Sequence, residues 1–320
     1  MKTNKYRLKN FSISFLAIVL GMMGFSLAFQ KTEESFLQTN NLYYYPLIFT
    51  WLLFLLVVFF YILKIVKFPE EFKKEFLHPI KINFFPILAK IFLLLSVIYL
   101  AINMDISRYF WYIGAGLQLF FSFLILSIWI RGKNMDWKFL NPAWFIPIVG
   151  NVIVPIAGVA HGYTEISYFF FSIGLVMWLA LFVVVFNRII FHHPIPDKLL
   201  PTFFILFAPP AIAFIAYIKL SSSFDVFARV LYYISMFLFV LIILQFKMFL
   251  KIKFYLSWWA YSFPLAAVTI ASLLFFHVSG IEFFKYVSIL LFLFLNLVIF
   301  YLLYRTVKAI VNAEICVEED

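Results

Sequence analysis

The stretch that decides the fold lies near the C-terminus and runs Trp258-Trp259-Ala260-Tyr261-Ser262-Phe263-Pro264-Leu265-Ala266-Ala267-Val268-Thr269-Ile270-Ala271. It contains no charged residue, yet a proline interrupts it near its middle. A proline removes a backbone hydrogen bond, and a membrane helix tolerates that loss only where protein or a water-lined cavity satisfies the freed carbonyl. The stretch therefore predicts a membrane-spanning helix in the interior of a helical bundle.

One large ring in this stretch stands on a face of small side chains. Steps of four residues from Phe263 reach Ala267 and Ala271, and Ala260 lies three residues before it. Residues at these spacings share a helix face. The pattern predicts a ring that plugs a pore beside a helix loosened by Pro264, or a ring that fills a packing gap against a neighbouring helix.

The composition of the whole chain places it in a membrane. Of its 320 residues, 65% are hydrophobic and only 12% are charged, whereas soluble domains carry about 25% charged residues. We expect an all-helical integral membrane protein, one domain over residues 1–320, with ten spans of about 20 apolar residues each. These spans lie near 11–30, 44–66, 79–101, 107–130, 142–160, 165–187, 199–219, 224–246, 257–278 and 283–304. The first is interpreted as a retained helix because no small-residue cleavage site follows it.

The basic residues predict the orientation of the spans. The two tails, 1–10 and 305–320, and the loops after even spans together hold 19 lysines and arginines, whereas the loops after odd spans hold 5 and Lys90 lies within a span. By the positive-inside rule both termini are cytoplasmic, and we expect the inner membrane of a bacterium. Lys219, Arg229 and Lys285, on the opposite side, either anchor helices or attract anions to a pore mouth.

Helix-breaking residues separate the odd spans from the even ones. The even spans have no interior proline, whereas the odd spans carry the candidate pore-helix kinks Gly21, Gly24, Pro86, Pro147, Pro155, Pro209, Pro210 and Pro264. The pattern predicts five helical hairpins in a quasi-five-fold arrangement whose odd helices line a central pore. The alternative is a compact bundle with ordinary kinks, since proline is common in membrane helices.

The interior of the spans lacks the groups that most chemistry requires. All 15 acidic residues fall in loops, tails or span ends, which argues against proton-driven pumps and cation carriers and suits an anion path. The five histidines lie near the interfaces without metal-site spacing, and Cys316 is the single cysteine. No phosphate loop, dinucleotide turn or nucleophile elbow is present. We therefore expect no enzyme activity, cofactor, metal or nucleic-acid partner.

Lys90 is the exception among the spans. A basic residue at the centre of a membrane helix costs about 2.5 to 3.5 kcal/mol on insertion scales. Either Lys90 places a positive charge at the pore wall, where it attracts anions, or the third span begins later and the side chain reaches the cytoplasmic interface.

Four segments of the chain resemble one family, the slow-type anion channels of plants and their bacterial relatives, the tellurite-resistance (TehA) and C4-dicarboxylate transporter proteins. The resemblance rests on the segments at 77–85, 148–151, 200–210 and 258–264. It implies a homotrimer whose protomers each hold a pore formed by the odd helices, occluded by the phenylalanine at Phe263. The long regulatory tails of the plant members have no counterpart here, so kinase control is not carried over.

Three functional hypotheses follow. The first is a passive channel for small inorganic or organic anions, gated by Phe263. The second is a secondary carrier or exporter of C4-dicarboxylates or of oxyanions such as tellurite or sulfite, which works by alternating access around the broken helices. The third is a membrane scaffold or sensor without transport.

Overall fold

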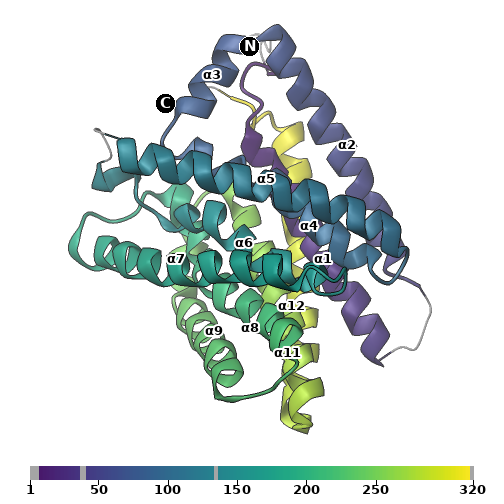
Figure 1. Cartoon of the computed structure of the whole chain (residues 1–320). Helices are drawn as coiled ribbons and strands as arrows, with labels where there is room; N and C mark the ends of the chain where they lie inside the picture. Colours follow the sequence, from purple (N-terminus) through teal and green to yellow (C-terminus); the bar gives the residue numbers. More distant parts are fainter. Residues whose placement is uncertain (1–6, 37–40, 133–135, 318–320) are drawn as a thin grey trace.

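The computed structural model describes residues 7–36, 41–132 and 136–317, and the regular structure in these residues is helical (Figure 1). Nine helical segments among them are long and apolar enough to cross a membrane, and Pro142–Gly158 forms a shorter apolar helix. The chain is therefore a multi-pass, all-helical membrane protein.

Five helices form the interior, and each of them begins with a 3-10 segment that continues the same span. The inner helices are α1 (Leu16–Phe36) after η1 (Ile13–Phe15), α4 (Ile87–Tyr99) after η2 (Lys81–Phe84), α6 (Phe145–Gly158) after η4 (Pro142–Trp144), α8 (Ala208–Ser221) after η5 (Asp197–Phe207) and α11 (Ser262–Ser279) after η6 (Leu256–Tyr261). In the segments around α1, α4, α8 and α11, 61 to 89% of residues are buried. All 14 residues of α6 are buried.

Five longer helices lie outside this group. They are α2 (Tyr44–Lys67), α5 (Met104–Arg131), α7 (Thr164–Phe191), α9 (Val226–Leu244) and α12 (Glu282–Val311). Only 22 to 33% of the residues in their apolar windows are buried, and side chains such as Leu52 and Phe300 are largely exposed. The exposed residues are apolar because lipid is their solvent.

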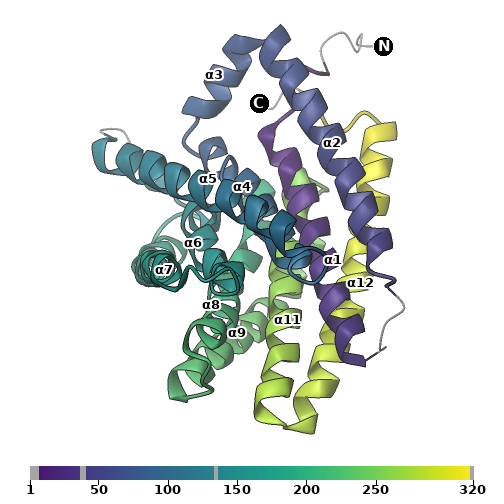
Figure 2. The same ribbon diagram turned by 45° about the vertical axis from the view of Figure 1, so that its right-hand side comes forward.

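The inner helices contact one another in a closed cycle. Helix α1 packs against α4 and α11, α6 packs against α4 and α8, and α8 packs against α11. Each inner helix also packs against the outer helix that follows it in the chain. Figure 2 shows α1 and α11 side by side in the interior, with α2 and α12 beyond them.

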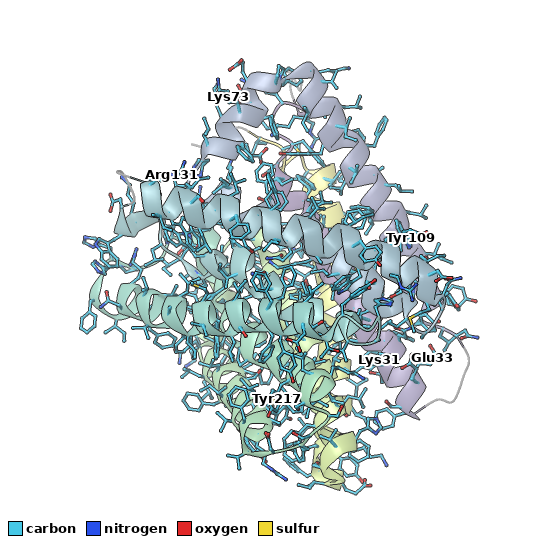
Figure 3. The ribbon with its side chains drawn as sticks, viewed as in Figure 1. Lys31, Glu33, Lys73, Tyr109, Arg131 and Tyr217 are labelled. Carbon is cyan, nitrogen blue, oxygen red and sulfur yellow. The ribbon has the colours of Figure 1, made fainter. Side chains whose placement is uncertain are left out.

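Both ends of the described chain lie on the same side of the bundle (Figure 1). The guanidinium of Arg7 donates a hydrogen bond to the carbonyl of Ile310 at 3.0 Å. Figure 3 places Lys73 at this end and places Lys31 and Tyr217 at the other. The inner helices therefore all run from the end that holds the termini toward the opposite end.

The buried carboxylate of Glu75 links the short helix α3 (Pro69–Leu77) to the start of the first span. Glu75 accepts hydrogen bonds from the Ser12 hydroxyl at 2.8 Å and the Ile13 amide at 2.7 Å. Its other oxygen accepts from the Lys64 ammonium at 2.5 Å and the Tyr61 hydroxyl at 3.2 Å. Because η1 begins at Ile13, the carboxylate also satisfies a free amide at a helix N-terminus. Three elements, α2, α3 and η1, are thereby held together.

We expect Glu75→Gln to destabilise the protein by about 3 to 5 kcal/mol, because losing one partner of a buried ion pair leaves Lys64 charged and unpaired. Both side chains of the pair are deeply buried, at 4% and 5% exposure. Thermal unfolding in detergent micelles measures the effect. Glu70→Gln, on the exposed side of the same helix, is the control and should leave the midpoint unchanged. Equal midpoints for the two variants would contradict the assignment.

Candidate functional site

A cavity of about 530 Å³ opens between the inner helices at the end opposite the termini. All five inner helical segments contribute to its wall, and none of the outer helices does. Its lining is mainly aliphatic, with Leu27, Leu94, Ile153 and Ile212 among the contributors. The charged and polar side chains of the lining come from the C-terminal ends of α1, α8 and α11 and are Lys31, Glu34, Ser35, Lys219 and His277. This outer cavity thus has an apolar interior and a polar rim.

A second, smaller cavity of about 50 Å³ lies toward the end that holds the termini. The five inner segments again form its wall, with Leu20, Phe84, Ile146 and Ile205 among the lining residues. The wall is apolar except for Lys90. This inner cavity is enclosed by the 3-10 segments and by the first turns of the α-helices that follow them.

Phe263 adjoins both cavities. Among the described residues it is the one side chain that lines both. It sits in the first turn of α11, directly after η6, and is half-buried. Ala267, one turn further along α11, lines the outer cavity, and Ala260 lines the inner one. The ring therefore stands between the two spaces, on the face of α11 that carries small side chains.

Glycines in α1 make room for this arrangement. Helix α1 continues through Gly21 and Gly24, and both face α11. A Cβ atom at Gly24 would lie 3.1 Å from Cδ2 of Phe263, and one at Gly21 would lie 2.0 Å from the Ser262 hydroxyl oxygen. The two helices therefore approach closely, and a Cβ atom at Gly24 would press on the ring.

Lys90 is buried in the wall of the inner cavity. It lies in the first turn of α4, and only 2% of the residue is exposed. Its ammonium donates a hydrogen bond to the carbonyl of Ile146 in α6. An ammonium carries three donors, and that carbonyl is its one acceptor among the described residues. The Lys90 side chain thus lines the inner cavity while its nitrogen is bonded to the backbone of α6.

Comparison with known proteins places this architecture in a family. The sequence pattern described as voltage-dependent anion channel matches residues 10–307. The chain belongs to the voltage-dependent anion channel family. That span includes every inner helix and Phe263, so both cavities lie within the part of the chain that the family shares.

Several named proteins are similar to this chain in sequence. The S-type anion channel SLAH2 of Arabidopsis thaliana is 36% identical over 244 residues, which cover 75% of this chain and 47% of the plant protein. The S-type anion channel SLAH3 of the same plant is 34% identical over 263 residues, covering 80% of this chain and 40% of that protein. A tellurite resistance protein TehA homolog of Haemophilus influenzae is 24% identical over 309 residues, covering 94% and 91%. The chain thus spans less than half the length of these two plant relatives.

The prolines of this family member lie mainly where a 3-10 segment gives way to an α-helix. Pro86 immediately precedes α4, Pro209 and Pro210 lie in the first turn of α8, and Pro264 lies in the first turn of α11. In α6, Pro147 lies in the first turn and Pro155 inside the helix. Of these prolines, Pro264 is the one that lines a cavity among the described residues.

A polar cluster between α5 and α6 escaped the sequence reasoning. The Gln118 amide donates to the carbonyl of Pro147 at 2.6 Å and to the Ser122 hydroxyl at 3.1 Å. The Asn151 amide donates to the same hydroxyl at 3.0 Å. A Cβ atom at Gly150 would lie 1.9 Å from the Gln118 oxygen, so a larger residue there would displace the Gln118 amide. The sequence signal that could have revealed this cluster is the pair Gln118 and Ser122, four residues apart on the otherwise apolar helix α5.

Cysteine labelling tests whether Phe263 separates the cavities. In a Cys316→Ser background, Ile212→Cys in the outer cavity should react readily with a membrane-impermeant thiol reagent added on the side opposite the termini. Ile205→Cys in the inner cavity should react far more slowly, because the ring blocks the way. Adding Phe263→Ala should make the two rates similar, as followed by mass spectrometry. Fast labelling of Ile205→Cys with Phe263 intact would contradict the separation.

Proposed function

We propose that this chain conducts small anions through the space enclosed by its five inner helices, with Phe263 as the gate. The observation that carries the proposal is the pair of cavities walled by the same five segments, with Phe263 in the lining of both. Displacement of that ring would join the cavities. A hydrophobic constriction of this kind stops ions because water leaves it.

The wall chemistry supports anions over cations. Glu34 is the one acidic residue in the lining of either cavity among the described residues, and its carboxylate pairs with Lys31 at 2.7 Å. Lys90 adds a positive charge at the inner cavity. The aliphatic wall offers no strong ligand for a small ion, and weak binding lets an ion leave as readily as it enters.

The proposal includes the architecture that the sequence predicts around this pore. Ten spans form five hairpins in quasi-five-fold order, with both termini cytoplasmic in a bacterial inner membrane and three protomers per assembly. The short fifth span suits this role, since η4 and α6 together rise about 27 Å at rises of about 2.0 and 1.5 Å per residue, close to the roughly 30 Å hydrocarbon core. Contacts between each inner helix and the next outer helix support the hairpins.

Phe263→Ala tests the gate. Lowering the barrier to conduction by only about 1.4 kcal/mol multiplies a rate about ten-fold, so we expect chloride current in patch-clamped or planar membranes to rise at least that much. Phe276→Ala is the matched control, because Phe276 lies on the same helix, is half-buried and lines neither cavity. An unchanged current in folded, inserted Phe263→Ala protein would refute the gate.

Lys90→Gln tests the charge at the inner cavity. The amide keeps a donor for the Ile146 carbonyl but removes the positive potential, and fields of this kind change local ion concentrations by about ten-fold or more. In the Phe263→Ala background we expect about ten-fold lower chloride conductance and weaker discrimination against cations, measured from reversal potentials. Lys285→Gln removes an exposed ammonium outside both cavities and should change neither quantity. Identical reversal potentials with and without Lys90 would contradict its role.

The second candidate is a secondary carrier or exporter of C4-dicarboxylates or oxyanions such as tellurite or sulfite. The observation that favours it is the buried Lys90 in the wall of the inner cavity, since a carrier holds its substrate near the bilayer midplane. Uptake into proteoliposomes separates the two functions. Saturable, proton-coupled uptake without single-channel events supports the carrier, whereas currents that follow the ionic gradient support the channel.

A further inference from the structure

The outer cavity has more apolar wall than a small inorganic anion uses. Its deep part is built from aliphatic side chains on four different helices, including Leu27, Leu94, Ile153 and Ile212. The floor is the Phe263 ring together with Ala267. Chloride and similar ions gain nothing from such a surface, whereas an alkyl chain gains free energy for every methylene that it removes from water.

The rim of the same cavity carries an ammonium that the protein leaves unpaired. Lys219 is exposed at the end of α8 and has no ion pair or hydrogen bond through its side chain with any described residue. The neighbouring groups are already bonded, since Lys31 pairs with Glu34 at 2.7 Å and the His277 ring is hydrogen-bonded to the Ser35 hydroxyl at 2.9 Å. The site thus combines an apolar chamber of about 530 Å³ with one free cation among the described residues at its mouth.

We propose that the outer cavity binds an amphipathic monoanion, an unbranched alkyl chain with one sulfonate or carboxylate. The head group pairs with Lys219, and the chain extends into the cavity toward Phe263. A ligand in this position fills the path to the ring, so it blocks conduction from the side opposite the termini. The block rests on the proposed channel function, whereas the binding does not.

Two measurable properties follow from this geometry. Each additional methylene that enters the cavity should tighten binding about four-fold, the ratio that corresponds to the usual free energy of burying one such group. The gain should stop once the chain reaches the Phe263 ring. The head group contributes separately, by about two- to five-fold, as expected of an ion pair at an exposed site.

Calorimetric titration of the purified, detergent-solubilised full chain with alkanesulfonates, from butanesulfonate to decanesulfonate below their micellar concentrations, tests the binding. Alkanesulfonates remain ionised at every pH used. Lys219→Gln should weaken all chain lengths by the same factor of about two to five, and Lys285→Gln, a basic residue outside the cavity, should weaken none. In Ala267→Phe, the tightening of binding with chain length should stop at a shorter chain, because the added ring occupies the deep end of the cavity. Phe263→Ala should extend the gain to longer chains.

Two results would overturn the inference. The first is the absence of saturable binding. The second is a chain-length series that neither Ala267→Phe nor Phe263→Ala alters, since that series would report partition into the detergent.

Vesicle flux then separates the two proposals. Binding without any anion flux supports the binding site and contradicts the channel, whereas anion flux without binding supports the channel and contradicts the binding site. In conducting Phe263→Ala vesicles, octanesulfonate should inhibit only from the side opposite the termini, and inhibition from the other side alone would overturn the block.

Discussion

A helix that lacks backbone hydrogen bonds has to be surrounded by protein when it crosses a membrane, because lipid offers no partner for a free carbonyl. Outer helices also donate side-chain hydrogen bonds to carbonyls of the inner spans. Trp111 of α5 donates to the carbonyl of Val154 in α6 at 2.9 Å, and Ser235 of α9 donates to the carbonyl of Phe207 before α8 at 2.9 Å. The division into buried and lipid-facing helices follows from this requirement.

The interior that results is closely packed at its helix contacts but hollow along its axis. Glycines bring α1 against α11, and the alanines of α11 leave space that bulkier side chains would occupy. Phe263 is the aromatic side chain of α11 at this level, and among the described residues it is the one that lines both cavities.

Two of the buried charged residues are held in different ways. Glu75 is satisfied by four donors at the end of the bundle and works as a structural fastener. Lys90 lies deeper, has a single carbonyl partner among the described residues and belongs to the wall of the inner cavity. A buried charge with few partners is costly, and such a cost is typical of positions that serve a function instead of stability.

The sequence by itself determined the helical membrane class and the separation of proline-bearing inner helices from outer ones, because hydropathy and proline act locally and need no knowledge of the fold. The family followed from the resemblance of four short segments. It also pointed to Phe263 and Lys90 as unusual among their neighbours. Only the tertiary structure decided that Phe263 lines two cavities, that Gly21 and Gly24 face α11, and that Lys90 meets the carbonyl of Ile146. These facts depend on contacts between residues far apart in the chain, and such contacts are set by how helices pack, which no local pattern encodes.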